Sequence, residues 1–135
     1  MSTATRTLTY ADLGGLPAKR EGDRHELIDG VLYVTPAPVP YHELVTMECI
    51  ALVLPFIRAG RLGRLLSAPV DVRLSDRDVV EPDLFFVRTN RLQIIGPAAI
   101  VGAPDLVVEI LSPSTRQRDL GLKRALYERH GVQEY

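Results

Sequence analysis

The sequence predicts a mixed α/β (α+β) domain in which a mixed or mostly antiparallel β-sheet is flanked by helices. A hairpin signal near the N-terminus, a long segment of helical periodicity after it, and several short β-branched runs before a second helical segment support this fold class. The length of 135 residues favours one domain, and a hydrophobic content of 46% is enough for a packed core.

Residues 1–9 are rich in Ser and Thr, and we expect them to form a flexible N-terminus that precedes a single domain at 10–135. They contain no hydrophobic region, so no signal peptide is visible. Thr9 is placed to cap a short helix at 10–13, with Asp12 at its third position. Gly14 and Gly15 follow and end this helix.

A hairpin and a long helix are predicted next. Asp29-Gly30, a strong two-residue turn signal, separates strands at 25–28 and 31–34. A proline-rich connector leads to an amphipathic helix at 41–59, which Pro55 is expected to kink or shorten. The apolar positions at helical spacing are Leu44, Val45, Cys49, Leu52, Val53 and Phe56.

The second half of the chain is predicted to alternate strands with polar turns and to end in a helix. Strands are expected at 62–66, 70–74, 79–87 and 106–111, an irregular segment at 88–103, and a helix from about 116 to 130, capped by 112–115 and ended by Gly131. Residues 132–135 have the pattern of another strand. We therefore expect a domain that is incomplete at its C-terminus.

Two of these strands carry acids in apolar surroundings. Glu109 lies within an apolar run, where an ionised carboxylate is costly unless it is paired or bound to a cation. Asp83 lies in the segment 79–87. If the two strands are neighbours, Asp83 and Glu109 converge on one ion, with a backbone carbonyl near Ile110 as a further ligand. Hard oxygen ligands of this kind favour Mg²⁺ or Mn²⁺.

Lys123 is one of only two lysines among sixteen basic residues. Its helical neighbours are Asp119, Leu120, Leu126 and Tyr127, so it borders an apolar face. An ammonium group there could orient a water molecule or stabilise charge that develops on a phosphate. The alternative is a solvent-exposed Lys123 that pairs with Asp119.

Each of the other acidic and basic candidates has a structural alternative. Asp83 could cap a loop, and Glu109 could be a buried acid paired with an arginine. Glu26 could be an exposed strand residue, and His42 a surface residue at the start of the long helix. For Asp105, a turn residue before a strand is a more natural interpretation than a metal ligand.

Several classes of protein are disfavoured. The chain contains no Gly-x-Ser-x-Gly elbow, no phosphate-binding Gly-x-x-x-x-Gly-Lys motif and no Cys/His zinc spacing. Ser112 and Ser114 have no local base and are interpreted as capping residues. A net charge of −1 gives no overall basic field. The single Cys49 fits a reducing compartment, so we expect a cytoplasmic protein, and no apolar run is long enough for a membrane span.

The motifs together resemble the Uma2 family, a group classed as restriction endonucleases within the PD-(D/E)XK nuclease superfamily. The resemblance runs from Tyr10 to Tyr135 and rests on Glu26-Leu27-Ile28-Asp29-Gly30, Pro82-Asp83-Leu84, the segment from Ala103 to Thr115, Asp119 with Lys123 and Tyr127, and Gly131-Val132-Gln133-Glu134-Tyr135. It implies a restriction-endonuclease-like core and metal-dependent cleavage of phosphodiester bonds.

The resemblance also implies roles for single residues. It matches the Pro-Asp element to Asp83 and the acidic strand position to Glu109, both as metal ligands. The lysine expected two residues after the acid is absent, because position 111 is Leu, and Lys123 is the candidate that replaces it from the next helix. Glu26 and His42 match the family pattern as supporting site residues.

Three hypotheses follow. The first is a Mg²⁺- or Mn²⁺-dependent endonuclease that acts on DNA. The second is a catalytically inactive nuclease-fold module that binds DNA or a protein partner, and the third is a purely structural domain. Self-association as a homodimer is compatible with all three. Because the net charge is nearly neutral, a DNA groove would need local arginines, for which the candidates are Arg58, Arg61, Arg64, Arg116, Arg118 and Arg124.

Overall fold

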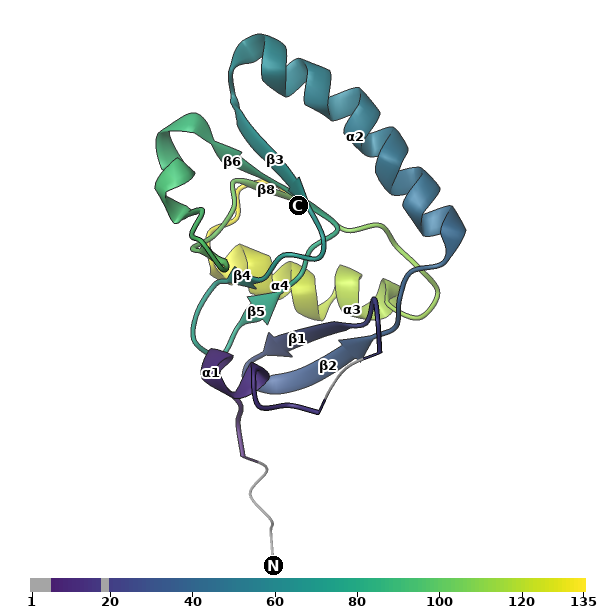
Figure 1. Ribbon diagram of the computed structural model, residues 1–135, viewed down its shortest axis with the longest axis vertical. Helices are drawn as coiled ribbons and strands as arrows, with labels where there is room; N and C mark the ends of the chain where they lie inside the picture. Colours follow the sequence, from purple (N-terminus) through teal and green to yellow (C-terminus); the bar gives the residue numbers. More distant parts are fainter. Residues whose placement is uncertain (1–5, 18–19) are drawn as a thin grey trace, which may run out of the picture.

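The computed structural model describes residues 6–17 and 20–135, so residues 1–5 of the expected N-terminus and Lys19 lie outside the described part of the chain. The elements are α1 (Tyr10–Leu13), β1 (Arg24–Ile28), β2 (Val31–Thr35), α2 (Pro40–Gly60), β3 (Gly63–Ser67), β4 (Val72–Arg73), β5 (Val79–Val80), β6 (Leu84–Arg88), the 3₁₀ helix η1 (Thr89–Ile94), β7 (Ile100–Val101), β8 (Leu106–Val108), α3 (Arg116–Leu120) and α4 (Leu122–Arg129). The predicted α+β class, with a mixed sheet flanked by helices, is confirmed (Figure 1). Among the described residues, no helix combines the length and apolar character needed to cross a membrane.

The N-terminal helix and the hairpin form as the sequence predicts. Thr9 and Asp12 make a capping box at the start of α1. β1 and β2 pair antiparallel around Asp29 and Gly30, whose φ angles of 51° and 75° are the positive values that a tight hairpin turn of this type requires. The hairpin continues through β5, β4 and β7 into a five-stranded sheet of order β2-β1-β5-β4-β7, in which only the β4–β7 pair is parallel.

The segment predicted as one strand at 79–87 is divided between two sheets. β5 belongs to the five-stranded sheet, whereas β6 lies in a three-stranded antiparallel sheet of order β3-β6-β8. Glu81, Pro82 and Asp83 form the link between them. The single-strand prediction was wrong because Pro82 has no N–H for a sheet ladder, which favours a break at this point. The predicted strand at 106–111 also ends early, at Val108, so Glu109 follows the strand.

The segment at 88–103 is more regular than predicted. It contains η1 and β7, and β7 pairs in parallel with β4. The C-terminal helix is divided at Gly121 into α3 and α4, where the prediction had one continuous helix. Residues 132–135 do approach the sheet, because the N–H of Val107 donates to the carbonyl oxygen of Glu134 at 2.9 Å.

α2 differs from its prediction in two ways. It runs through Pro55 to Gly60 without being shortened. Its apolar residues were expected to face the core, yet only Thr46 and Ile57 are buried, while Leu44, Leu52 and Phe56 are exposed by 65%, 77% and 72%. In Figure 1, α2 runs along the outside of the domain, whereas β3 lies beside β6, with which it pairs.

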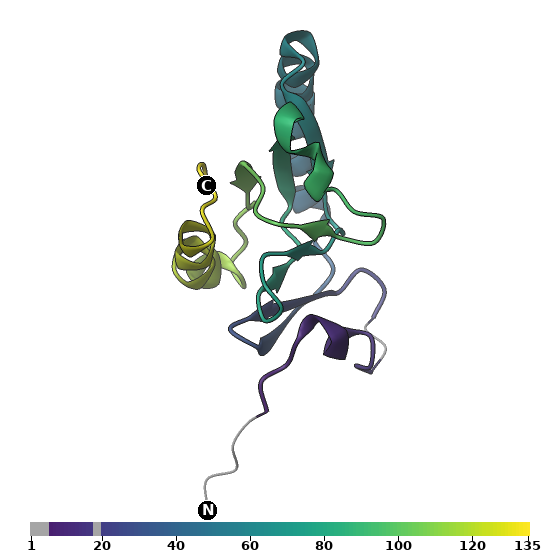
Figure 2. The same cartoon turned by 90° about the vertical axis from the view of Figure 1, so that its left-hand side faces the viewer.

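One hydrophobic core joins the two sheets to α4. Its fully buried members come from both sheets and from α4: Ile28, Val72, Val80, Phe85, Val87, Ile100, Val107, Leu126 and Tyr127. α4 lies on one side of the strands (Figure 2). Because this core brings α4 against the ends of β1 and β8, it also fixes where the charged side chains of these elements meet.

Two phenylalanines provide a matched test of this description. Phe85 is fully buried in β6, so Phe85→Ala should lower the free energy of unfolding by about 3–5 kcal/mol. Phe56→Ala, on the exposed face of α2, should change it by no more than about 0.5 kcal/mol. Urea denaturation followed by circular dichroism measures both. Equal losses in the two variants would show that the α2 face is covered in solution.

Candidate active site

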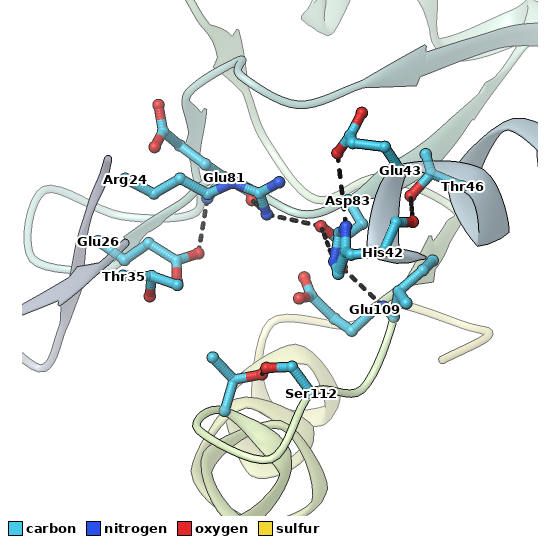
Figure 3. A network of polar contacts seen from close by, with 12 residues as sticks. Arg24, Glu26, Thr35, His42, Glu43, Thr46, Glu81, Asp83, Glu109 and Ser112 are labelled. Carbon is cyan, nitrogen blue, oxygen red and sulfur yellow. Dashed lines mark hydrogen bonds and ion pairs between the residues drawn. The ribbon is translucent and has the colours of Figure 1, made fainter. Parts of the chain in front are cut away.

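A cavity of about 290 Å³ lies between β1, the start of α2 and α3, next to the start of β6 and the end of β8. Its lining residues come from these elements and from the loops between them: Arg24, Glu26, Thr35, Pro36, Ala37, Pro38, Val39, His42, Asp83, Glu109, Ile110, Ser112, Pro113, Ser114, Thr115, Arg118 and Asp119. Four carboxylates, from Glu26, Asp83, Glu109 and Asp119, therefore line one cavity, and the first three are labelled in Figure 3.

Strand pairing sets the positions of Asp83 and Glu109. β6 and β8 are antiparallel, with Leu84 opposite Val108, so Asp83 immediately precedes one strand at the point where Glu109 follows the other. The predicted proximity of their strands is confirmed. The backbone link is direct, because the N–H of Ile110 donates to Oδ2 of Asp83 at 2.7 Å.

Asp83 is only 3% exposed. Its second oxygen, Oδ1, has two side chains as neighbours. Nη1 of Arg24 donates to Oδ1 at 2.6 Å, and Nε2 of His42 lies 3.3 Å from the same atom. Both oxygens of Asp83 are thus engaged by protein groups. The loop-capping role considered for Asp83 is present as well, through its hydrogen bond with Ile110.

Lys123 lies behind the lining of the cavity, between two carboxylates. Its Nζ is 2.9 Å from Oε2 of Glu26 and 3.0 Å from Oε1 of Glu109, and the side chain is only 2% exposed. The hydroxyl of Tyr127 also donates to Oε1 of Glu109, at 3.1 Å, and the N–H of Glu81 donates to Oε2 of Glu26, at 2.8 Å. This buried network joins β1, the end of β8 and α4.

The charges of this network do not balance. Burial raises the pKa of Glu109 to about 8, against the opposing effect of Lys123, and Glu26 and Asp83 raise it further. Burial favours the uncharged form of Glu109 most strongly, and the neighbouring negative charges add to this effect, so the folded protein keeps the proton on Glu109 to a higher pH. For Lys123, burial acts to lower the pKa, but Glu109 and Glu26 outweigh it and raise the pKa above its ordinary value.

The structure distinguishes between the alternative roles that the sequence allows for several of these side chains. Lys123 is not a solvent-exposed partner of Asp119, and Glu26, at 3% exposure, is not an exposed strand residue. Glu109 is a paired buried acid, but its partner is Lys123 rather than an arginine. His42 is largely covered, with 12% of its side chain exposed. Asp105 lies outside the cavity, where it accepts from the N–H of Arg88 and pairs with Arg91.

Two residues of the site were not singled out as functional by the sequence analysis. Arg24 lies two residues before Glu26, so both point to the same face of β1, and that spacing was the available signal. Tyr127 is one helical turn after Lys123 and contributes the hydroxyl group that reaches Glu109.

Of the six arginines considered for a nucleic-acid groove, only Arg118 lines the cavity. It donates to the hydroxyl of Thr35 at 3.1 Å and lies over the ring of Tyr33, 5.1 Å from its centroid. The other five are exposed. Arg118 is thereby held at the rim between α3 and β2, with its charge directed toward the cavity wall.

The donor set for a metal ion is small. Among residues 6–17 and 20–135, no three His, Cys, Asp or Glu side chains form a group that could hold a metal ion. Two carboxylates in one cavity nevertheless fit an ion such as Mg²⁺, which keeps several waters and often uses only one or two protein carboxylates. In the described part of the chain, the contacts of Glu109 go to Oε1, so its Oε2 remains available.

A comparison with solved structures finds the same fold. The chain superposes with a TM-score of 0.75 on a crystal structure described as a putative nuclease belonging to DUF820 from Anabaena variabilis ATCC 29413. The two sequences are 24% identical, and the match covers 93% of this chain and 70% of that chain. This likeness shows the shared fold. No curated protein sequence matches the chain.

The family itself is shown by a match over most of the chain. The model of the Uma2 family, described as "Putative restriction endonuclease", matches residues 10–135. The chain therefore belongs to the Uma2 family, and the resemblance noted from its motifs is confirmed. The description of this family indicates a nuclease as the class of protein.

The buried ammonium group gives a stability prediction. Lys123→Met would leave Glu26 and Glu109 buried without their cation, and we expect the free energy of unfolding to fall by about 3–5 kcal/mol at neutral pH. Arg124→Met, which removes an exposed cation at the next position of α4, is the control and should change it by no more than about 0.5 kcal/mol. Similar losses in both variants, measured by urea denaturation, would contradict the central role of the Lys123 network.

The raised pKa of Glu109 gives a pH dependence. In the unfolded chain Glu109 loses its proton near its ordinary pKa of 4.5, whereas in the folded protein it keeps the proton to about pH 8. The folded state therefore binds more protons in this window, so this residue's contribution to stability falls as the pH rises from about 4.5 to 8.

Glu109→Gln removes this titration while keeping an oxygen for Tyr127 and Lys123. In EDTA, the difference in stability between the variant and the parent should shift in favour of the variant between pH 5 and pH 8. Urea denaturation at several pH values measures it. Parallel stability curves would show that Glu109 is ionised throughout this range.

Proposed function

We propose that this chain is a Mg²⁺- or Mn²⁺-dependent endonuclease that hydrolyses phosphodiester bonds of DNA. The observation that carries the proposal is the arrangement of Asp83 and Glu109 at the adjacent ends of paired strands, in one cavity, with a buried lysine behind them. Membership of the Uma2 family supports the same chemistry.

The residues fit a divalent cation. Asp83 and Glu109 would hold it, with the free Oε2 of Glu109 and the backbone carbonyl of Ile110 as available oxygens. When bound, such a cation lowers the pKa of a water molecule and stabilises negative charge on the phosphate. Its positive charge would oppose the effect of burial on Glu109 and so favour the ionised carboxylate in the loaded protein.

The other residues position and balance these two acids. Lys123 holds Oε1 of Glu109 together with Tyr127 and so directs Oε2 toward the cavity. Glu26 anchors Lys123 from β1. His42, with Nε2 close to Asp83 at the cavity wall, is placed to orient this carboxylate or to contact a phosphate oxygen. Arg118 supplies local positive charge at the rim for the nucleic-acid backbone.

One observation favours a second function, a catalytically inactive nuclease-fold module that binds DNA or a protein. Both oxygens of Asp83 are already engaged, by Arg24 and by the N–H of Ile110, and the position two residues after Glu109 holds Leu111. In this alternative the charged network is structural, and the protein binds DNA equally well with and without a divalent cation.

Cleavage assays with Asp83→Asn and Glu109→Gln test the proposal. With supercoiled plasmid, single-stranded DNA and RNA as substrates, we expect Mn²⁺-dependent cleavage of DNA by the parent and none by either variant. Asp105→Asn, which removes the charge of another buried aspartate outside the cavity, is the matched control and should remain active if it folds. Glu26→Gln should weaken activity about 10- to 100-fold, as supporting residues around a metal commonly do.

Calorimetry with Mn²⁺ separates the two candidate functions. Binding that is lost in Asp83→Asn and Glu109→Gln, with circular dichroism unchanged, supports the metal site. DNA binding in EDTA without cleavage under any metal would support the inactive module instead. A folded parent that binds no divalent ion would exclude the proposed nuclease mechanism.

A further inference from the structure

Arg24 occupies the position that a cation would need at Asp83. Its Nη1 lies 2.6 Å from Oδ1 of Asp83 and 3.2 Å from the carbonyl oxygen of Glu81. Oδ2 of Asp83 accepts from the backbone N–H of Ile110, whereas the partners of Oδ1 are side chains, Arg24 and, at 3.3 Å, Nε2 of His42. A divalent ion and the Arg24 guanidinium therefore compete for the same carboxylate oxygen.

The two cationic side chains of the site, Lys123 and Arg24, differ in the contacts that hold them and in their exposure. Lys123 is 2% exposed and is held by two carboxylates, behind the cavity lining. The Arg24 side chain is 14% exposed, lines the cavity, and makes one ion pair and one contact with a backbone carbonyl. Release of Arg24 therefore breaks one ion pair and one hydrogen bond at the cavity, whereas release of Lys123 breaks a buried network.

We propose that Arg24 is an exchangeable counter-ion. It neutralises Asp83 in the metal-free protein, gives up Oδ1 when a divalent cation binds, and then contacts the phosphodiester group of the nucleic-acid substrate. This inference rests on the proposed nuclease function and adds a substrate-binding role that the comparisons do not assign.

A charge count of the groups in direct contact supports the exchange. The carboxylates of Glu26, Asp83 and Glu109, when ionised, carry three negative charges, which Lys123 and one divalent cation balance. Arg24 then loses its carboxylate partner, since Asp119, the fourth acid in the lining, forms no ion pair with it in the described part of the chain. A phosphodiester has a single negative charge and oxygen atoms that suit the planar guanidinium fork, so it matches the released side chain.

Mn²⁺ calorimetry on the parent and on Arg24→Met tests the first step. Removing the competing cation should strengthen Mn²⁺ binding by about tenfold to a hundredfold, the range expected for loss of one charge-assisted hydrogen bond. Arg118→Met is the matched control, because Arg118 lines the same cavity but contacts Thr35 and Tyr33. It should leave the affinity for Mn²⁺ unchanged.

The outcomes distinguish the inference from the function on which it rests. A parent that binds Mn²⁺, together with a folded Arg24→Met variant that binds it equally or more weakly, overturns the exchange and leaves the metal site intact. If neither folded protein binds Mn²⁺, the proposed function fails and the inference fails with it. A variant that binds Mn²⁺ where the parent does not supports the exchange.

A measurement on the unmodified protein covers the case in which Arg24→Met does not fold. In ¹H–¹⁵N spectra, the Nε–Hε signal of Arg24, assigned with Arg24→Lys, should shift on titration with Mg²⁺ and exchange faster with water. An unchanged Arg24 signal, while backbone signals near Asp83 and Glu109 move, would contradict the release of Arg24.

DNA binding tests the second step. Fluorescence anisotropy with a short duplex should show that Arg24→Met weakens binding clearly in Ca²⁺ and much less in EDTA, because only the loaded protein frees Arg24. Arg118→Met should weaken binding by the same factor in both conditions. An equal loss for Arg24→Met with and without Ca²⁺ would overturn the transfer to the phosphate.

Discussion

The ammonium group of Lys123, buried between Glu26 and Glu109, is the interaction on which the rest of the site depends. It ties together β1 of the five-stranded sheet, the end of β8 in the three-stranded sheet, and α4. Burial of charged groups is strongly unfavourable unless each is paired, so none of the three can be removed alone without leaving an uncompensated charge. The positions of the two sheets and of α4 are therefore coupled to the electrostatics of the cavity, not only to packing of the apolar core.

Stability alone does not account for such a network. Buried ion pairs can often be replaced by apolar residues of similar size with no loss of stability. Here burial, together with the negative charges of Glu26 and Asp83, raises the pKa of Glu109, and Arg24 pairs with Asp83. A cavity lined by several carboxylates is unfavourable as a purely structural element, and the proposed divalent cation would supply the positive charge that such a cavity lacks.

The sequence predicted the local elements better than their arrangement. Asp29-Gly30 predicted the hairpin because these residue types accept the two positive φ angles of the turn, although their N–H groups also donate to Asp78 and to the carbonyl oxygen of Arg77. The helical spacing of Leu44, Leu52 and Phe56 was interpreted as a buried face, but periodicity shows only that a face is apolar and not what covers it. Pro82, which cannot donate to a sheet ladder, was a local signal for the break between β5 and β6, but the placement of these strands in different sheets and the bend at Gly121 depend on tertiary packing. The burial of Lys123 also depends on tertiary packing, because a helical position that borders an apolar face fits either a snorkelling or a buried lysine side chain.

The register of the β6–β8 pair determines how Asp83 and Glu109 are placed relative to each other. Leu84 lies opposite Val108, and this pairing places Asp83 and Glu109 at one edge of the β6–β8 ladder, on the side where α4 presents Lys123. Successive side chains of a strand point to opposite faces, so a slip of one residue would turn one of these carboxylates away from the other. Phe85 and Val107, which pair in the same ladder and are fully buried, hold the register against such a slip. The hydrophobic core thus specifies the distance between the two acids, and the geometry of the site follows from the packing of residues that have no charge.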